Sequence, residues 1–462
     1  MKALNRRSFL SSSVMMALYG ATFSTTSAAQ SGGLSSAALS WRNWSGGVVA
    51  HPLARFSATS ESQLAKFMAT TKGPVRPVGS GHSFSPLVPT DGSLIVIDQI
   101  ASLTDHNSSE LTATFGAGSR LGDLGPVLEA AGQAMFNLPD IDRQTLAGAT
   151  ATATHGTGIN FKCLSAYITK LILVTPAGDI LEIDAKSNAD LFNAVRVSVG
   201  ALGIVTSITM QNRLPFRLKQ KSWVDTTENL LANFDQHAAA YRHFEIFPLT
   251  HSDYSIALST EETLDDVNNP KPSVEEAAAF DNVRQLWMTV APGDRRPLIN
   301  AVAEQIEPSE RIDSSYKILT NVRNSRFNEM EYAVPISSGA DCIREILQTI
   351  SALNIDVVYP LEYRYVSRDD TWLSMSSGHE DHAAISIHRD ASEDYRPYFD
   401  IIEPIFWKYG GRPHWGKIHS LGAEQLTALY PRFDAFQAVR EKLDPSGRML
   451  NDHLRKLFGV GI

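Results

Sequence analysis

The stretch PVGSGHSFS, residues 77–85, follows a short apolar segment at 75–78 that predicts a β-strand. Gly79 and Gly81 allow the backbone to approach a ligand closely, because no Cβ stands in the way. His82 comes directly after this turn, so its imidazole can point into whatever the turn holds. One interpretation is a ligand-binding loop. The other is a surface turn with a solvated histidine, since short glycine motifs also occur by chance.

Length and composition describe an ordinary globular chain. The 462 residues are enough for two or three domains, with 43% hydrophobic and 20% charged residues. The formal net charge of −9 argues against a nucleic-acid-binding surface or a polybasic membrane patch. The cysteines, Cys163 and Cys342, lack the spacing typical of zinc or iron–sulfur sites, so we expect no metal. Whether they pair stays open.

The N-terminus carries the pattern of a twin-arginine export signal in residues 1–29. Arg6 and Arg7 precede Phe9 and Leu10, a weakly apolar stretch covers 14–23, and small residues at 27–29 offer a cleavage site. The apolar stretch is too short to span a bilayer. We therefore expect a periplasmic or secreted protein that meets the twin-arginine translocase already folded, with its cofactor bound. The alternative is a frayed basic terminus; a linker at 30–44 follows.

Hydrophobic periodicity predicts an α+β chain that changes character near residue 214. Helices are expected at 60–71, 121–131, 190–197, 274–290 and 340–353. Strands are expected at 94–98, 111–115, 170–174, 180–184, 203–210, 356–366 and 383–388. The segment LAGATATATHGTG, residues 146–158, consists mostly of small residues. It fits a backbone that passes close to a flat or charged group, and a tight helix crossing is the alternative.

Four stretches together resemble the vanillyl-alcohol-oxidase superfamily of flavoproteins, in its aldonolactone/alditol oxidase branch. They are residues 77–84, residues 146–158, LFNAVRVSVGALG at 191–203, and HWGK at 414–417. The resemblance covers about residues 45–460. It implies a two-subdomain FAD-binding domain of the PCMH type at 45–214. A C-terminal α+β substrate domain with an antiparallel sheet is then expected at 215–462.

The resemblance also assigns cofactor contacts. His82 matches the histidine that carries FAD covalently through the 8α-methyl group. The turn around it matches the pyrophosphate-binding loop, where successive N–H groups can form an anion-binding nest. A second flavin-contacting loop is implied near residue 150, and a further backbone contact near 204. The residues implied besides His82 are Gly79, Ser80, Gly81, Ser83, Gly148, Thr154, His155, Gly156, Gly158, Ile204 and Val205.

Three segments of the C-terminal half are expected to face the flavin ring. Alternation along a strand at 361–365 places Glu362 and Arg364 on one face. The resemblance implies that this pair contacts substrate oxygens, that His388 lies in the substrate pocket, and that Lys417 binds or stabilises the substrate oxygen. The alternatives are a surface ion pair, a structural histidine and a solvated lysine. The cofactor does the redox chemistry, while the protein orients and polarises.

One position bears on the electron acceptor. The family's oxygen gate falls on Pro139, where the resemblance implies an oxidase that forms hydrogen peroxide. Asp140 stands where alditol oxidases place a serine, which weakens the case for an alditol substrate. We predict oxidation of a CH–OH group in a sugar-derived lactone or polyol, with oxygen as acceptor. The alternatives are a dehydrogenase using a quinone or cytochrome, and a non-catalytic flavin- or carbohydrate-binding envelope protein.

Overall fold

The computed structural model describes residues 40–268, 287–321 and 325–461. The predicted signal at 1–29 and most of the linker lie outside these residues, as does nearly all of the helix predicted at 274–290. Among the described residues, no helix combines the length and the apolar character needed to cross a membrane. Cys163 and Cys342 are both buried and unpaired, which answers the question the sequence left open.

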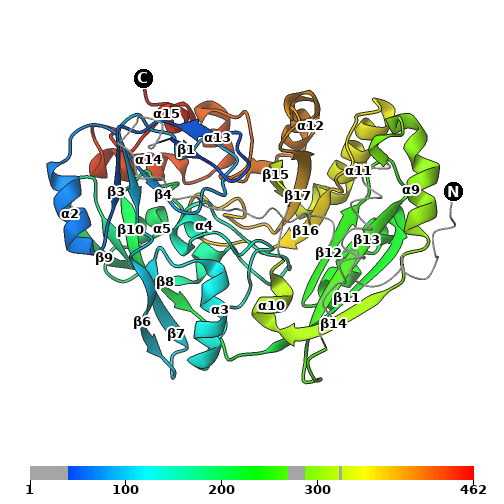
Figure 1. The fold of residues 1–462 in the computed structure, drawn as a ribbon, viewed down its shortest axis with the longest axis horizontal. Coiled ribbons are helices and arrows are strands. Elements are labelled where there is room, and N and C mark those ends of the chain that lie inside the picture. The colour runs from blue at the N-terminus through cyan, green and yellow to red at the C-terminus, as the bar shows by residue number, and fades with distance from the viewer. Residues whose placement is uncertain (1–39, 269–286, 322–324, 462) are drawn as a thin grey trace, which may run out of the picture.

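The first half of the chain contains two sheets flanked by helices (Figure 1). A parallel sheet has the order β3 (Ala54–Ser57), β5 (Ser93–Val96), β4 (Val75–Val78), and the hairpin β1 (Trp41–Arg42) and β2 (Val49–Ala50) precedes it. An antiparallel sheet has the order β6 (Ala101–Asn107), β7 (Thr112–Ala117), β10 (Ile204–Gln211), β8 (Ile168–Val174), β9 (Ile180–Asp184). The helices are α2 (Glu61–Thr70), α3 (Leu121–Ala130), α4 (Leu146–Ala151) and α5 (Ala189–Arg196).

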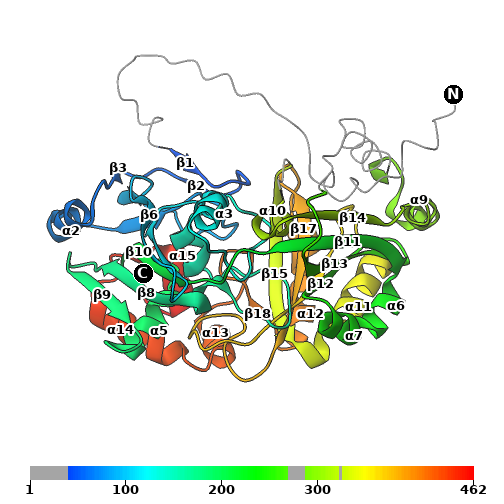
Figure 2. The same cartoon turned by 90° about the horizontal axis from the view of Figure 1, so that it is seen from below.

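The second half forms one eight-stranded antiparallel sheet. Its order is β14 (Ser309–Ser314), β11 (Arg217–Thr226), β13 (Tyr254–Thr263), β12 (His243–Pro248), β16 (Glu362–Val366), β17 (His382–Asp390), β15 (Phe327–Pro335), β18 (Arg412–Pro413). Helices cover one face: α6 (Thr227–Ala232), α7 (Phe234–Ala240), α11 (Ile336–Ala352) and α12 (Arg396–Lys408). Beside them are α9 (Arg295–Ala303) and α10 (Ser315–Leu319). Figure 2 shows β15 and β17 in the middle of the molecule, next to the first half.

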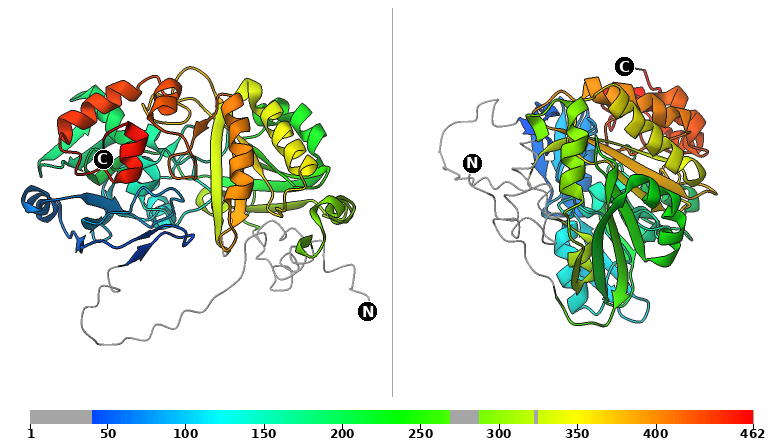
Figure 3. Two further views of the ribbon diagram at one scale, coloured as in Figure 1. Left: turned by 90° about the horizontal axis from the view of Figure 1, so that it is seen from above. Right: turned by 90° about the vertical axis from the view of Figure 1, so that its right-hand side faces the viewer.

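The last helices return to the first half of the molecule (Figure 3). These are α13 (Ala423–Leu429), α14 (Phe433–Leu443) and α15 (Asp452–Phe458). Arg448 donates to the carbonyl oxygens of Met68 at 2.9 Å, Pro176 at 3.0 Å and Thr71 at 2.7 Å. A division of the chain at residue 214 therefore does not separate the two halves in space.

Buried Arg76 ties this return to the N-terminal sheet. Its guanidinium donates to the carbonyls of Leu87 at 2.9 Å, Val199 at 2.8 Å and Gly200 at 2.9 Å, and also to Met449 in the returning segment. Burial lowers the pKa of Arg76 to about 9. A cation surrounded by carbonyl groups satisfies several backbone acceptors at once, which a buried apolar side chain would leave unpaired.

The predicted α+β fold with a C-terminal antiparallel sheet is what the structure shows, with local corrections. The strand predicted at 356–366 is only β16, because Pro360 has no N–H to donate to a neighbouring strand. Part of the small-residue segment is helical, as α4, where Thr145 caps the first turn by accepting from the Gly148 N–H at 3.2 Å. Exposed β6 was not predicted, since its sequence shows no apolar alternation.

Candidate active site

Two adjoining hollows share lining residues, and one lies within the first half of the molecule while the other lies where the two halves meet. The first is lined by loops at 76–83, 144–152 and 198–205. The second is lined by residues 139–141 and 154–155 of the first half together with β15, β16, β17 and the 414–417 turn. His82, Ser83, Gln144 and Thr152 line both. An elongated ligand can therefore extend from one into the other.

The loop at 79–83 suits an anionic group. In the part of the chain that the structure describes, the backbone N–H groups of residues 80–83 have no protein acceptor, and the buried Ser80 hydroxyl has no partner either. Gly81 has φ of +70°, and a Cβ on Gly79 would come within 2.2 Å of Thr145 Oγ1. Free donors on a glycine turn fit a pyrophosphate, so the residues present fit the cofactor that the sequence predicted.

His82 stands between the hollows with its ring against Trp44. The two rings stack with centroids 5.3 Å apart and an interplanar angle of 25°. Burial, with the nearby charges of Lys417, Arg120 and Arg143, lowers the pKa of His82 to about 4. The imidazole is therefore neutral at physiological pH and keeps the nitrogen lone pair that a covalent bond would use.

One face of the eight-stranded sheet is polar where it borders the second hollow. Side chains alternate along each strand, so one face of β15, β16 and β17 collects the polar residues. The opposite face collects apolar and aromatic ones that pack on helices. The polar set consists of Glu329, Glu331, Glu362, Arg364, Ser386 and His388, all of them buried.

Glu331 is the centre of this polar face. Its carboxylate accepts from His155 Nε2 at 2.8 Å, from Arg364 Nη2 at 3.2 Å and from Ser386 Oγ at 2.8 Å. Burial raises the pKa of Glu331, but the charge and hydrogen bond of His155 outweigh burial and hold the pKa well below its ordinary value. A charged carboxylate with several donors joins the two halves of the molecule at this point.

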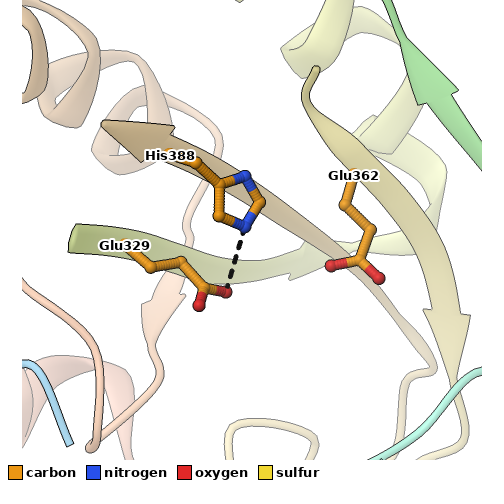
Figure 4. A group of neighbouring side chains, drawn as sticks. All are labelled: Glu329, Glu362 and His388. Atoms are coloured by element: carbon orange, nitrogen blue, oxygen red, sulfur yellow. Dashed lines mark ion pairs between the residues drawn. The ribbon is translucent and has the colours of Figure 1, made fainter. Parts of the chain in front are cut away.

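Glu329 links Lys417 to His388. Its carboxylate accepts from Lys417 Nζ and lies 3.7 Å from His388 Nε2. Burial raises the pKa of Glu329, but Lys417 and His388 lower it to about 2. Figure 4 shows the side chains of Glu329, His388 and Glu362 around one space. One atom of each that could bind a metal ion, a carboxylate oxygen or a ring nitrogen, lies within 4.8 Å of the other two. Lys417 and Arg364 already supply positive charge to the two carboxylates, so the cluster is better explained as an ion-pair network than as a metal site.

Arg364 pairs with two carboxylates and lies opposite a third across the sheet. It donates to Glu362 Oε1 at 2.8 Å and to Glu331, and it lies opposite Glu245 of β12. Burial and the neighbouring Glu362 raise the pKa of Glu245 to about 7, although Arg364 opposes this. Burial likewise raises the pKa of Glu362. Burial thus favours the protonated form of both carboxyl groups.

The structure brings most of the predicted site residues together. The first hollow is lined by Gly79, Ser80, Gly81, His82, Ser83, Gly148, Ile204 and Val205. The second is lined by His82, Ser83, Pro139, Asp140, Thr154, His155, Glu362, Arg364, His388 and Lys417. The predicted Glu362/Arg364 pair lies on one strand face and is buried rather than on the surface.

Gly156 and Gly158 are exceptions, because they line neither hollow. A Cβ on Gly156 would come within 2.3 Å of the Leu138 carbonyl oxygen. At Gly158, with φ of +127°, it would come within 2.7 Å of the Phe161 ring. Close packing is sufficient reason for glycine at these two positions, and their contact with the cofactor stays a prediction.

Sequence reasoning missed Glu329, Glu331, Glu245, His414 and Trp44. Glu329 and Glu331 alternate with apolar residues in 327–335, and that alternation was a usable signal for acidic residues on a buried strand. Nothing local marks Glu245, because its environment comes from β16 across the sheet.

Comparison with known proteins assigns the chain to a family. It matches the FAD binding domain family over residues 52–184 and the D-arabinono-1,4-lactone oxidase family over 208–457. L-gulono-1,4-lactone dehydrogenase of Mycobacterium tuberculosis is 34% identical, covering 91% of this chain and 99% of its own. L-gulonolactone oxidase of Bos taurus is 30% identical, covering 90% and 98%. Alditol oxidase of a Streptomyces species is 27% identical, again covering 90% and 98%.

The fold has solved relatives as well. Cholesterol oxidase from B. sterolicum aligns with a TM-score of 0.75 at 15% identity, covering 91% of this chain and 96% of that one. At this identity the likeness concerns the fold alone. The superfamily, the branch and the FAD cofactor predicted from the sequence are confirmed. The chain belongs to the D-arabinono-1,4-lactone oxidase family and is an FAD-dependent oxidoreductase acting on CH–OH donors.

Proposed function

We propose that this enzyme oxidises a CH–OH group of a sugar-derived lactone or polyol and passes the electrons to oxygen. The observation that carries the proposal is the second hollow, where Lys417, His388 and the Glu362/Arg364 pair face the His82 loop across one space. Relatives named for lactones and alditols support the substrate class. Carboxylates outnumber permanent cations in the lining, which favours an uncharged substrate over an anionic one.

Oxidation of CH–OH to C=O removes a hydride and a proton. FAD, when bound, accepts the hydride, so the chain must orient the substrate and take the proton. His388 Nδ1 lies 3.3 Å from the Pro360 carbonyl oxygen, which can only accept, so Nδ1 carries the hydrogen. In the neutral imidazole, Nε2 has the lone pair that can accept the hydroxyl proton. Glu329, 3.7 Å away, stabilises the imidazolium that forms.

The permanent cations hold the substrate oxygens. Lys417 Nζ is paired with Glu329 and lies 5.1 Å from the centre of the Phe84 ring. As an ammonium it can donate to the reacting oxygen and stabilise developing negative charge. Glu362 accepts and Arg364 donates, a combination that suits neighbouring hydroxyl or lactone oxygens.

The identity of the electron acceptor is the more specific part of the proposal. Oxygen would take up two electrons and two protons per substrate oxidised and leave as hydrogen peroxide. Pro139 in the lining of the second hollow, at the gate position of the resemblance, supports an oxidase. The mycobacterial relative is named a dehydrogenase, so a quinone or cytochrome acceptor is the second candidate.

One experiment tests substrate and acceptor together. The oxidised enzyme is mixed anaerobically with lactones, alditols, aldoses and an open-chain aldonate, and flavin bleaching is followed. The reduced enzyme is then mixed with aerated buffer in a stopped-flow instrument. We expect a neutral lactone or polyol to bleach the flavin and air to restore it rapidly with peroxide formed. A reduced flavin that persists in air would replace the oxidase proposal with the dehydrogenase one, and the absence of bleaching by every neutral compound would refute the substrate class.

Covalent attachment of FAD to His82 and export by the twin-arginine route belong to the same proposal. The neutral His82 ring at the junction of the hollows supports the bond, and Arg6 and Arg7 support the export route. Acid precipitation should carry the flavin with the wild-type protein and leave it in solution with His82→Ala.

Replacement of Arg6 and Arg7 by lysine should retain the protein in the cytoplasm of a host with this translocase, and unchanged export would refute the route.

A further inference from the structure

Two buried histidines lie side by side at the second hollow with opposite hydrogen-bond surroundings. The ring centroids of His155 and His414 are 6.0 Å apart. His155 Nδ1 lies 3.0 Å from the Gly156 carbonyl oxygen, and His155 Nε2 lies 2.8 Å from Glu331 Oε1. Both partners are acceptors, so both nitrogens of His155 must carry hydrogen. His414 Nδ1 instead accepts from the Gly416 N–H at 3.0 Å, so that nitrogen carries none.

Glu331, on β15 of the second half, holds the His155 ring of the first half through this hydrogen bond. Its side chain is 1% exposed, and the His155 side chain is 2% exposed. Arg364 and Ser386 donate to the other carboxylate oxygen, Oε2, which leaves Oε1 for His155. A buried carboxylate with this set of donors stays ionised, and an ionised partner at 2.8 Å favours the protonated imidazole.

We propose that His155 in the second hollow carries hydrogen on both ring nitrogens, as an imidazolium, and that Glu331 is the positioning residue that accepts from Nε2. This cation stands on the flavin side of the site, in the loop after α4, separate from Lys417 and Arg364 on the substrate side. A flavin that has accepted a hydride carries extra negative charge, and a fixed cation beside it raises the reduction potential. The inference rests on the proposed function, with FAD extending from the first hollow so that its ring lies in the second.

The charges that face His155 come from three elements. Glu331 of β15 and Arg364 of β16 form one chain with it, and His414 approaches from the turn after β18. Burial lowers the pKa of His414 to about 3, so this neighbour adds no charge near neutral pH. Loss of the Glu331 charge would leave His155 Nε2 without its carboxylate acceptor while Arg364 stays in place.

Two measurements test the proposal without substrate turnover. Histidine labelled with 15N, with His155→Gln used to assign the signal, should show both ring nitrogens of His155 protonated in the wild-type protein at neutral pH. The midpoint potential of the bound flavin should fall in Glu331→Gln and in His155→Gln. His414→Gln is the matched control, since it alters a histidine of the same hollow that carries no charge.

The outcomes separate this inference from the proposed reaction. A neutral His155 in the wild-type spectrum would overturn it, as would an unchanged potential in Glu331→Gln. An equal fall in His414→Gln would show that disruption of the hollow, rather than charge, sets the potential. If Glu331→Gln fails to fold, the spectrum of the wild-type protein still decides. An enzyme that oxidises none of the compounds tested would refute the substrate proposal and leave both measurements interpretable.

Discussion

A single hydrogen bond, to the Pro360 carbonyl oxygen, fixes the tautomer of His388. This tautomer leaves Nε2 as a proton acceptor next to Glu329. We predict that His388→Ala slows anaerobic flavin reduction by about 10²- to 10⁴-fold, the usual contribution of a general base. Substrate affinity should change less than the rate. Stopped-flow absorbance measures both, and added imidazole should restore part of the rate. A variant that reduces its flavin at the wild-type rate would assign the proton to another group.

Glu245 should make stability depend on pH. Its pKa is raised from 4.5 to about 7 by burial and by Glu362. A carboxyl whose pKa is higher in the folded state contributes stability below pH 4.5, and this contribution is lost as pH rises toward about 7. Glu245→Gln cannot ionise, so its Tm should rise relative to wild type across that range. Thermal unfolding at several pH values measures the difference. Exposed Glu310 supplies the control variant Glu310→Gln, and a Tm difference that does not vary with pH would contradict the assignment.

Local pattern predicted some site residues and not others. Glu362 and Arg364 were placed correctly because alternation along one strand fixes their common face. Glu331 was missed because its role depends on the register that sets it beside Ser386 of β17 and on a histidine 176 positions away. The cofactor contact predicted for Gly156 and Gly158 stays a prediction, because a sequence does not distinguish a glycine required by a ligand from one required by packing.

At the scale of elements, the hairpin of β1 and β2 supports the His82 loop. The Trp44 N–H donates to the Gly81 carbonyl at 2.7 Å, and Asn43 donates to the Ser83 carbonyl at 3.0 Å. Trp44 also contacts Phe327 of the large sheet, with ring centroids 5.1 Å apart. The hairpin thus fixes the loop against both halves of the molecule.

Removal of the Trp44 ring should therefore loosen His82. We predict that Trp44→Ala lowers the fraction of flavin retained after acid precipitation, while Trp44→Phe keeps most of it, because an aromatic pair contributes about 0.5–1.5 kcal/mol. Flavin fluorescence on a denaturing gel gives the bound fraction. Full retention in Trp44→Ala would mean that the loop holds His82 without the hairpin.

Elements with strong periodicity were predicted to within a few residues, as for α3, α5, α11 and β10. Others failed for identifiable reasons. Strand β6 is exposed along most of its length, so no hydrophobic alternation marks it. The helix α4 consists of Ala, Gly, Thr and Leu, and its start depends on the Thr145 cap rather than on an apolar stripe.

At the scale of the whole molecule, the architecture depends on the returning C-terminal segment. Arg448 satisfies carbonyl groups at the end of α2 and in the turn between β8 and β9. We predict that Arg448→Met lowers the Tm, since each buried acceptor left unpaired costs about 1–3 kcal/mol. It should also speed the loss of any flavin that is not covalently held. Lys442→Met, an exposed change on α14, is the control, and equal Tm values for the two variants would refute the role of Arg448.

The same segment also supports the wall of the first hollow. Arg76 and Leu87 line the first hollow, Arg76 donates to Met449, and Asn451 donates to the carbonyls of Pro86, Leu87 and Pro89. Met449 and Asn451 thus support one wall of the first hollow from a segment that is far away in the sequence. A variant that lacks residues 448–461 would contain every residue that lines the two hollows, and it would still lack the hydrogen bonds that hold this wall in place.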